Sequence, residues 1–261
     1  TTNDIQITGS LEIEGDITGS GRLNLNNGSN SIIIGKNAAT SNPSSNSVFI
    51  GYGARSNSTA GNAVAIGQDA EAGYNNVAVG KSAEANGAYT VSLGWYANQG
   101  GSAGNSVFIG YNTGRGVGGS NTAVGGRSMY FTYGTGNTIV GTGAFDGGGS
   151  NNDNNTIVGN NAGLNGSNNV LIGNNAGSTA TLNNKLYIEN SNSTTPLIYG
   201  EFDNDIARIN GKLFVSNSLD VTGSATVTGD ITTNTLSNIS TTLTSDSATN
   251  VDTFATATYT G

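Results

Sequence analysis

A short pattern of polar and apolar positions recurs ten times along this chain. A polar pair comes first, then three strand-forming residues, then glycine, as in Asn46-Ser47-Val48-Phe49-Ile50-Gly51. Steps of 13 to 18 residues separate the anchoring glycines, which are Gly35, Gly51, Gly67, Gly80, Gly94, Gly110, Gly125, Gly141, Gly159 and Gly173. A repeat of this period is typical of stacked coils, with one supersecondary unit per repeat. The pattern therefore predicts a solenoid rather than a globule.

The regions on either side of the repeats alternate apolar and polar residues between glycines, which is typical of short strands and turns. No stretch has a helical period, so we expect an all-β protein. We divide it into an N-terminal β stalk (1–29), a ten-repeat β-roll (30–180), a β-rich neck or prism (181–233) and a Ser/Thr-rich stalk or linker (234–261). The chain begins without methionine, so we expect it to be a piece of a longer protein with a further domain after residue 261.

The two faces of each predicted strand are both apolar. Side chains alternate along a strand, so the first and third residues of each triplet share one face. We expect this face, with residues such as Val64 and Ile66, to fill the inside of the coil. The middle residues then form a second apolar face, which a soluble monomer would not leave exposed. We expect an intertwined homotrimer with these middle residues at its interface: Ile33, Phe49, Ala65, Ala78, Phe108, Ile139, Ile157 and Leu171.

The composition excludes several kinds of chemistry. The chain has no cysteine and no histidine, which removes disulfides, thiolate metal sites and every histidine-dependent catalytic triad. Its net charge is −8, so we expect no binding to nucleic acid. No apolar run approaches the length of a membrane span, so we expect no membrane insertion. We predict neither a cofactor nor a metal.

The repeat itself resembles that of a known family. The phrase N-S-V-x-I-G-x-x-A, as in Asn46 to Ala54, resembles the head repeat of YadA-like trimeric autotransporter adhesins. The resemblance covers about 150 residues and implies a left-handed parallel β-roll that assembles as a trimer. Thr122, Thr138 and Thr156 depart from it by replacing the first valine. The same roll also occurs in bacteriophage fibres.

The flanking segments resemble bacteriophage proteins more closely. Residues 184–190 and 196–202 are similar to a segment of phage tail fibres and related bacterial surface proteins, and residues 219–231 resemble the triple-stranded β-prism stalks of phage fibres. The ending, Val251 to Tyr259, resembles the opening of a small β domain of cyanophage virion proteins. The resemblance implies a virion fibre outside the cell, whose partners are its own copies and other virion proteins.

Short motifs elsewhere have simpler explanations. Gly114-Arg115-Gly116-Val117-Gly118-Gly119 fits a dinucleotide fingerprint, but no helix follows it, so we interpret it as a loop. Asp203-Asn204-Asp205 lacks the glycine and distal glutamate of a calcium loop and is interpreted as a turn. The acids of the roll could support glycoside hydrolysis as a pair, but we interpret them as solvated corner residues: Asp69, Glu71, Glu84, Asp146 and Asp153.

Aromatic residues outside the strand triplets are candidate receptor contacts. Trp95 and Tyr96 follow a repeat glycine, while Tyr130, Phe131 and Tyr133 lie in an insertion after Gly125. Exposed rings can stack on sugars or anchor a protein partner, although they also cap and pack at coil corners. We therefore expect contact with a host cell-surface glycan or protein to involve these five residues.

Together these patterns predict a non-enzymatic trimeric virion fibre, a tail fibre or appendage, that acts as a rigid spacer and host-attachment structure. A bacterial trimeric autotransporter adhesin head is the first alternative, and a glycan depolymerase tailspike is the second. An ice-binding roll would need a flat outward threonine array. It ranks last because Thr122, Thr138 and Thr156 occupy expected inward positions.

Overall fold

The fold is a stack of parallel β-coils. A computed structural model describes residues 30–228 apart from 40–44, 58–60, 102–103, 116–117, 132, 148, 150–151 and 227. The predicted N-terminal stalk and the segment 234–261 lie outside the described residues. The chain divides into two units, residues 1–213 and 214–261, and the coils belong to the first. Within the described residues every regular element is a β-strand, as expected.

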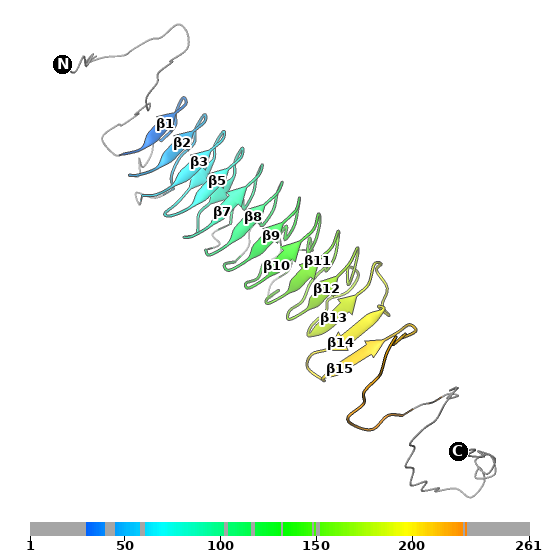
Figure 1. Cartoon of the computed structure of the whole chain (residues 1–261). Coiled ribbons are helices and arrows are strands. Elements are labelled where there is room, and N and C mark those ends of the chain that lie inside the picture. Colours follow the sequence, from blue (N-terminus) through cyan, green and yellow to red (C-terminus); the bar gives the residue numbers. More distant parts are fainter. Residues whose placement is uncertain are drawn as a thin grey trace, which may run out of the picture. The chain divides into compact units, whose positions relative to one another are not determined.

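Each repeat contributes one three-residue strand to a single sheet, which Figure 1 shows as a ladder of arrows. The ten repeat strands are β1 (Ile32–Ile34), β2 (Val48–Ile50), β3 (Val64–Ile66), β5 (Val77–Val79), β7 (Val91–Leu93), β8 (Val107–Ile109), β9 (Thr122–Val124), β10 (Thr138–Val140), β11 (Thr156–Val158) and β12 (Val170–Ile172). Neighbouring strands are parallel and in register, so each triplet position forms its own column along the stack. The return legs of two coils add a second small sheet, β4 (Glu71–Ala72) with β6 (Glu84–Ala85).

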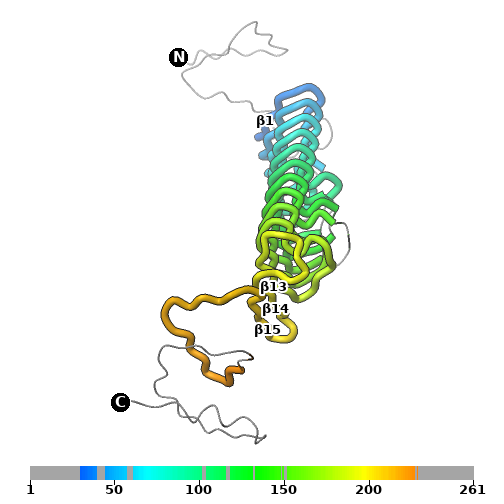
Figure 2. Tube along the Cα trace, turned by 90° about the vertical axis from the view of Figure 1, so that its right-hand side faces the viewer, coloured from blue at the N-terminus to red at the C-terminus, as the bar shows by residue number. Residues whose placement is uncertain are grey.

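The corner after each strand requires glycine. Gly67 has a φ of 134°, a region that side chains with a Cβ rarely adopt. A Cβ added there would lie 2.5 Å from the carbonyl oxygen of Gly80 in the next coil. The recurring glycine therefore allows both the turn and the close approach of stacked coils. Figure 2 shows the result, a column of similar coils from β1 to β13.

The inward and outward faces of the strands are the reverse of our expectation. The middle residues from Phe49 to Leu171 are buried inside the chain's own coil, with at most 1% exposure. The first and third residues point outward and are half-buried or exposed. The return leg supplies the opposite wall of the interior, largely with alanines such as Ala70 and Ala83. Inward residues of very different size, from Ala65 and Ser92 to Phe108, are fully buried, so each coil is closely packed around its own middle residue.

A column of buried polar residues explains this choice of face. The residue just before each triplet shares the inward face with the middle residue. Asn121, Asn137, Asn155 and Asn169 stack in this column. The side-chain oxygen of Asn155 accepts hydrogen bonds of 3.0 Å from both the backbone N–H and the side-chain amide of Asn169. Each buried side-chain amide thereby forms hydrogen bonds with the next coil, so burying this polar group costs little free energy.

The roll continues for one coil beyond the predicted block and then changes character. β13 (Lys185–Ile188) pairs in parallel with β12, with Tyr187 beside Leu171 on the inward column. β14 (Ile198–Glu201) and β15 (Ile206–Ile209) follow as antiparallel strands. The residues Asp203 to Asp205 lie in the turn between them, which confirms the predicted turn. Tyr187 and Tyr199 pack at this end of the interior, with ring centroids 5.6 Å apart.

Candidate functional site

The outward face of the strands is a continuous apolar surface. Its two columns contain mostly valine and isoleucine from β1 to β12. Several members are substantially exposed in the single chain, including Ile34 at 47% and Val158 at 41%. We call this surface the strand face. It is long and regular, and soluble monomers rarely leave an apolar surface of this length exposed.

The residues predicted at the trimer interface do not lie on this face. Phe49, Ala65, Ala78, Phe108, Ile139, Ile157 and Leu171 are all buried inside the coil, and Ile33 is half-buried on the same inward column. The seven buried residues have almost no exposed surface for contact with a partner while the coil is intact. Thr122, Thr138 and Thr156 are exposed on the strand face, contrary to the inward positions expected for them.

Trp95 and Tyr96 belong to a small exposed cluster at the corner after β7. Trp95 is 50% exposed and stacks on Tyr96 with ring centroids 5.3 Å apart. In the next coil Tyr111 occupies the same position, 48% exposed and 5.4 Å from Trp95. In the preceding coil the ammonium of Lys81 lies 5.9 Å from the centroid of the Trp95 ring. We call these four residues the tryptophan group.

Tyr130 and Phe131 form a second cluster with two arginines. The ring centroids lie 4.3 Å apart. The guanidinium of Arg115 lies 4.9 Å from the Phe131 ring, and that of Arg127 lies 4.7 Å from the Tyr130 ring. We call these four residues the arginine group. Tyr133 is exposed, but in the described part of the chain no ring contact joins it to either group.

The two groups lie on consecutive coils. The backbone N–H of Arg127 donates a 2.7 Å hydrogen bond to the carbonyl of Tyr111. The sequence indicated the rings, but it missed the cations beside them. The signal was present in the spacing, because Arg115 and Tyr130 each lie five residues after a repeat glycine and so fall in one column.

The acids of the roll are held by local bonds at the corners and return legs. Glu71 pairs with Arg55, and Asp146 pairs with Arg127 at 2.8 Å. Glu84 accepts hydrogen bonds from Asn86 and from the backbone of Gly100. The register of β4 and β6 nevertheless places Glu71 beside Glu84, a pairing that the sequence analysis did not foresee.

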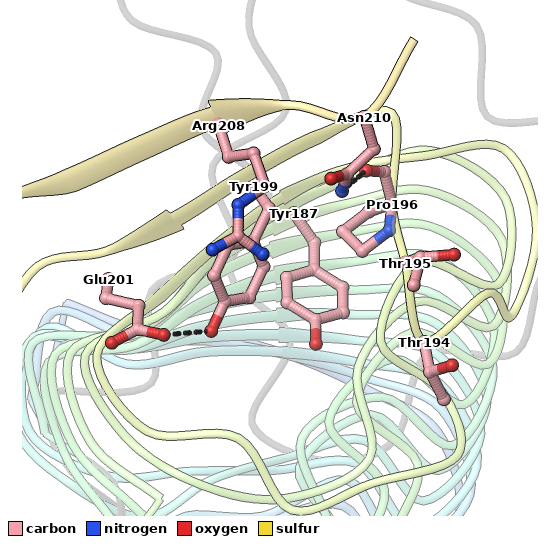
Figure 3. A pocket seen from close by; sticks show the side chains of 8 residues that line it. All are labelled: Tyr187, Thr194, Thr195, Pro196, Tyr199, Glu201, Arg208 and Asn210. Carbon is pink, nitrogen blue, oxygen red and sulfur yellow. Dashed lines mark hydrogen bonds between the residues drawn. The ribbon is translucent and has the colours of Figure 1, made fainter. Parts of the chain in front are cut away.

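A polar pocket of about 230 Å³ lies at the end of the roll, between the segment before β14 and the last strands (Figure 3). Its lining residues are Tyr187, Thr194, Thr195, Pro196, Tyr199, Glu201, Arg208 and Asn210. The hydroxyl of Tyr199 donates a hydrogen bond to Glu201, which raises the pKa of Tyr199 to about 12 and lowers that of Glu201. None of the carboxylates Glu71, Glu84, Asp146 and Asp153 lines this pocket.

The described residues include no group of three or more potential metal-binding His, Cys, Asp or Glu side chains. They also include no helix with the length and apolar character needed to cross a membrane.

Comparison with known proteins adds no relative. No family model, no curated protein and no solved structure matches this chain.

Proposed function

We propose that this chain is a non-enzymatic structural element of a fibre, a homotrimer that joins through its strand faces. The fibre is a virion appendage that acts as a stiff spacer and contributes to host attachment. The phage-like segments at 184–202 and 219–231 support the virion assignment. The roll is of the left-handed parallel type that the repeat resembles.

The strand face is the observation that carries this proposal. Its valine and isoleucine columns follow every coil, and a straight apolar surface on a rod is buried most completely against equivalent rods. Closed symmetry around one axis limits this association, whereas an open arrangement would continue into aggregates. The trimer remains the proposed state, but its interface moves from the middle residues to the first and third residues of each triplet.

A trimer would also multiply weak contacts. Each corner cluster would occur three times around the fibre, so millimolar single contacts could together hold a cell surface through avidity. Attachment then requires no deep pocket. Shallow exposed surfaces such as the tryptophan and arginine groups suit this kind of binding.

The molar mass in solution tests the proposal. We expect light scattering to give three times the 26.2 kDa chain mass, and electron microscopy to show short rods. A well-folded sample with the mass of one chain would contradict it. Analysis of the virion with antibodies against the roll would then test where the fibre lies.

Two of the alternatives predict different outcomes. A bacterial adhesin head would assemble in the same way, but a membrane-anchor barrel would follow it in the full-length protein. A glycan depolymerase would cut host polysaccharide. Its most direct test is the substitution of Glu71 and Glu84 by glutamine, because these are the carboxylates in register on adjacent coils.

Ice binding would use the threonines Thr122, Thr138 and Thr156, which lie outward and not at the inward positions expected for them. The threonine column spans only β9, β10 and β11, and a trimer through the strand face would cover it. Thermal hysteresis in a monomeric sample would favour this alternative over the fibre.

A further inference from the structure

The two corner clusters place exposed aromatic rings on neighbouring coils. Lys81, Trp95 and Tyr111 occupy one column, each directly after a repeat glycine. In the next coil the same column holds Gly126, where an added Cβ would meet only the carbonyl oxygen of Tyr111, at 3.9 Å. The surface beside Tyr111 is therefore open on that side. Flat exposed rings with open space beside them suit stacking against the apolar face of a sugar ring.

The charge of this surface is opposite to that of the chain. The whole chain carries −8, yet three of its nine basic residues, Lys81, Arg115 and Arg127, lie against these rings. Arg127 is paired with Asp146. Among the described residues, Lys81 and Arg115 have no carboxylate within ion-pair distance. Two cations without an acidic partner favour a ligand that brings its own carboxylates, which a guanidinium binds through paired hydrogen bonds.

The arrangement along the stack indicates a chain rather than a single sugar. Successive members of the clusters come from consecutive coils, and the hydrogen bond from Arg127 to Tyr111 joins the two groups directly. Stacked coils repeat at about 4.8 Å, the spacing of neighbouring strands. This is close to the length of one sugar unit, so a linear glycan parallel to the stack could present one unit to each coil.

We propose that the tryptophan and arginine groups bind a linear acidic polysaccharide, of the uronic-acid class, along the direction of coil stacking. This inference extends the receptor contact of the proposed fibre and so rests on that function. The rings supply stacking, while Lys81 and Arg115 supply the charge that distinguishes an acidic glycan from a neutral one.

The test is calorimetric binding of oligogalacturonate to the full chain, with the methyl-esterified oligomer as a neutral control of the same shape. We expect the acid form to bind and the ester to bind at least about tenfold more weakly, since the ion pairs are lost. Binding of the acid form should weaken as salt is added. Equal affinity for both forms would overturn the proposal.

Paired variants locate the site. Trp95→Ala with Tyr111→Ala, and separately Lys81→Gln with Arg115→Gln, should each weaken binding by about tenfold or more. Tyr89→Ala, which removes an even more exposed ring at a different corner, should leave binding unchanged. Melting temperatures close to that of the unmodified chain would show that each variant is folded. Undiminished binding in both paired variants, or loss of binding in Tyr89→Ala, would overturn the assignment.

The result separates this inference from the fibre itself. An intact trimer that binds none of the acidic oligomers would overturn the glycan site and leave the proposed fibre standing. A monomeric chain that binds them through Trp95 and Arg115 would overturn the trimer and leave the glycan site standing.

Discussion

At the scale of single residues, the glycines after the strands carry the tightest constraint. We expect Gly67→Val to destabilise the roll by more than the roughly 1 kcal/mol that glycine preferences usually involve. The new Cβ would collide with Gly80, and φ at 134° disfavours any side chain. Thermal unfolding measures the effect. Gly126→Ala, whose new Cβ would lie 3.9 Å from the carbonyl oxygen of Tyr111, should be nearly neutral.

The buried asparagine column gives a second prediction at this scale. Asn155→Leu removes the acceptor for two hydrogen bonds from Asn169 and leaves the N–H groups without partners inside the roll. Each unpaired buried group costs about 1–3 kcal/mol, so we expect a loss of several kcal/mol in the free energy of unfolding. Denaturant titration provides the measurement. Asn174→Ala, at an exposed site outside this column, should change little, and equal losses in both variants would contradict the argument.

The hydroxyl of Tyr199 should lose its proton only at unusually high pH. Its hydrogen bond to Glu201 favours the neutral phenol and raises its pKa to about 12. The resulting stabilisation is present below the ordinary pKa of about 10 and is lost as the pH rises through 12. Tyr199→Phe should remove one late step from an ultraviolet titration, and Glu201→Gln should move that step to lower pH. An unchanged titration in both variants would show that the bond is not formed.

At the scale of the element, substitutions in a single strand can distinguish the folding of one chain from the assembly of the trimer. Phe108 and Ile109 are neighbours in β8, but Phe108 is fully buried and Ile109 is exposed on the strand face. We expect Ile109→Asp to abolish the trimer while each chain keeps its β-structure. Phe108→Asp should instead unfold the surrounding coils, because it places a charge in the core.

Circular dichroism and light scattering distinguish these outcomes. As a milder test, Phe108→Ala should cost about 3–5 kcal/mol, the usual range for a buried phenylalanine. A folded trimer in Ile109→Asp would show that the strand face is not the interface.

The strands themselves were predictable, but their orientation was not. The triplets fixed the position and register of all ten repeat strands, since each glycine marks the same corner. Alternation defines two faces without saying which is inside. Bulky Val64 and Ile66 suggested the interior, whereas the decisive sign was the polar residue that precedes nine of the ten triplets, such as Asn137. Such a residue looks solvent-exposed in one repeat and becomes a satisfied interior ladder only when coils stack.

For the candidate contact residues, the sequence indicated the aromatic rings but not the cations that contact them. Trp95, Tyr96, Tyr130 and Phe131 stood out because they lie outside the strand triplets, at a corner and in an insertion. Their partners could not be identified from linear neighbours, because Lys81 and Arg115 belong to the preceding coils. A contact between coils depends on the exact length of each return leg, and that length varies from repeat to repeat.

At the scale of the first unit, the coils should behave as exchangeable layers. Deletion of residues 80–93 removes one complete coil and joins Val79 directly to Gly94. We expect the shortened chain to fold with its register intact, because each coil contacts only its neighbours. Deletion of residues 80–86 removes half a coil and should prevent the remainder from stacking. Similar melting behaviour in the two deletions would contradict a layered architecture.

The antiparallel strands after β13 limit the end-to-end association of one chain with another. β14 and β15 are joined by the turn from Phe202 to Asp205, and the rings of Tyr187 and Tyr199 lie at the end of the interior. A second copy of the chain could pair its first strand with the edge of the sheet at this end. Its return leg, however, would find no return leg of a preceding coil on which to stack. End-to-end polymerisation, the usual hazard of an open strand edge, is thereby discouraged. The number of stacked coils is then determined by the number of repeats in the sequence and does not change with protein concentration.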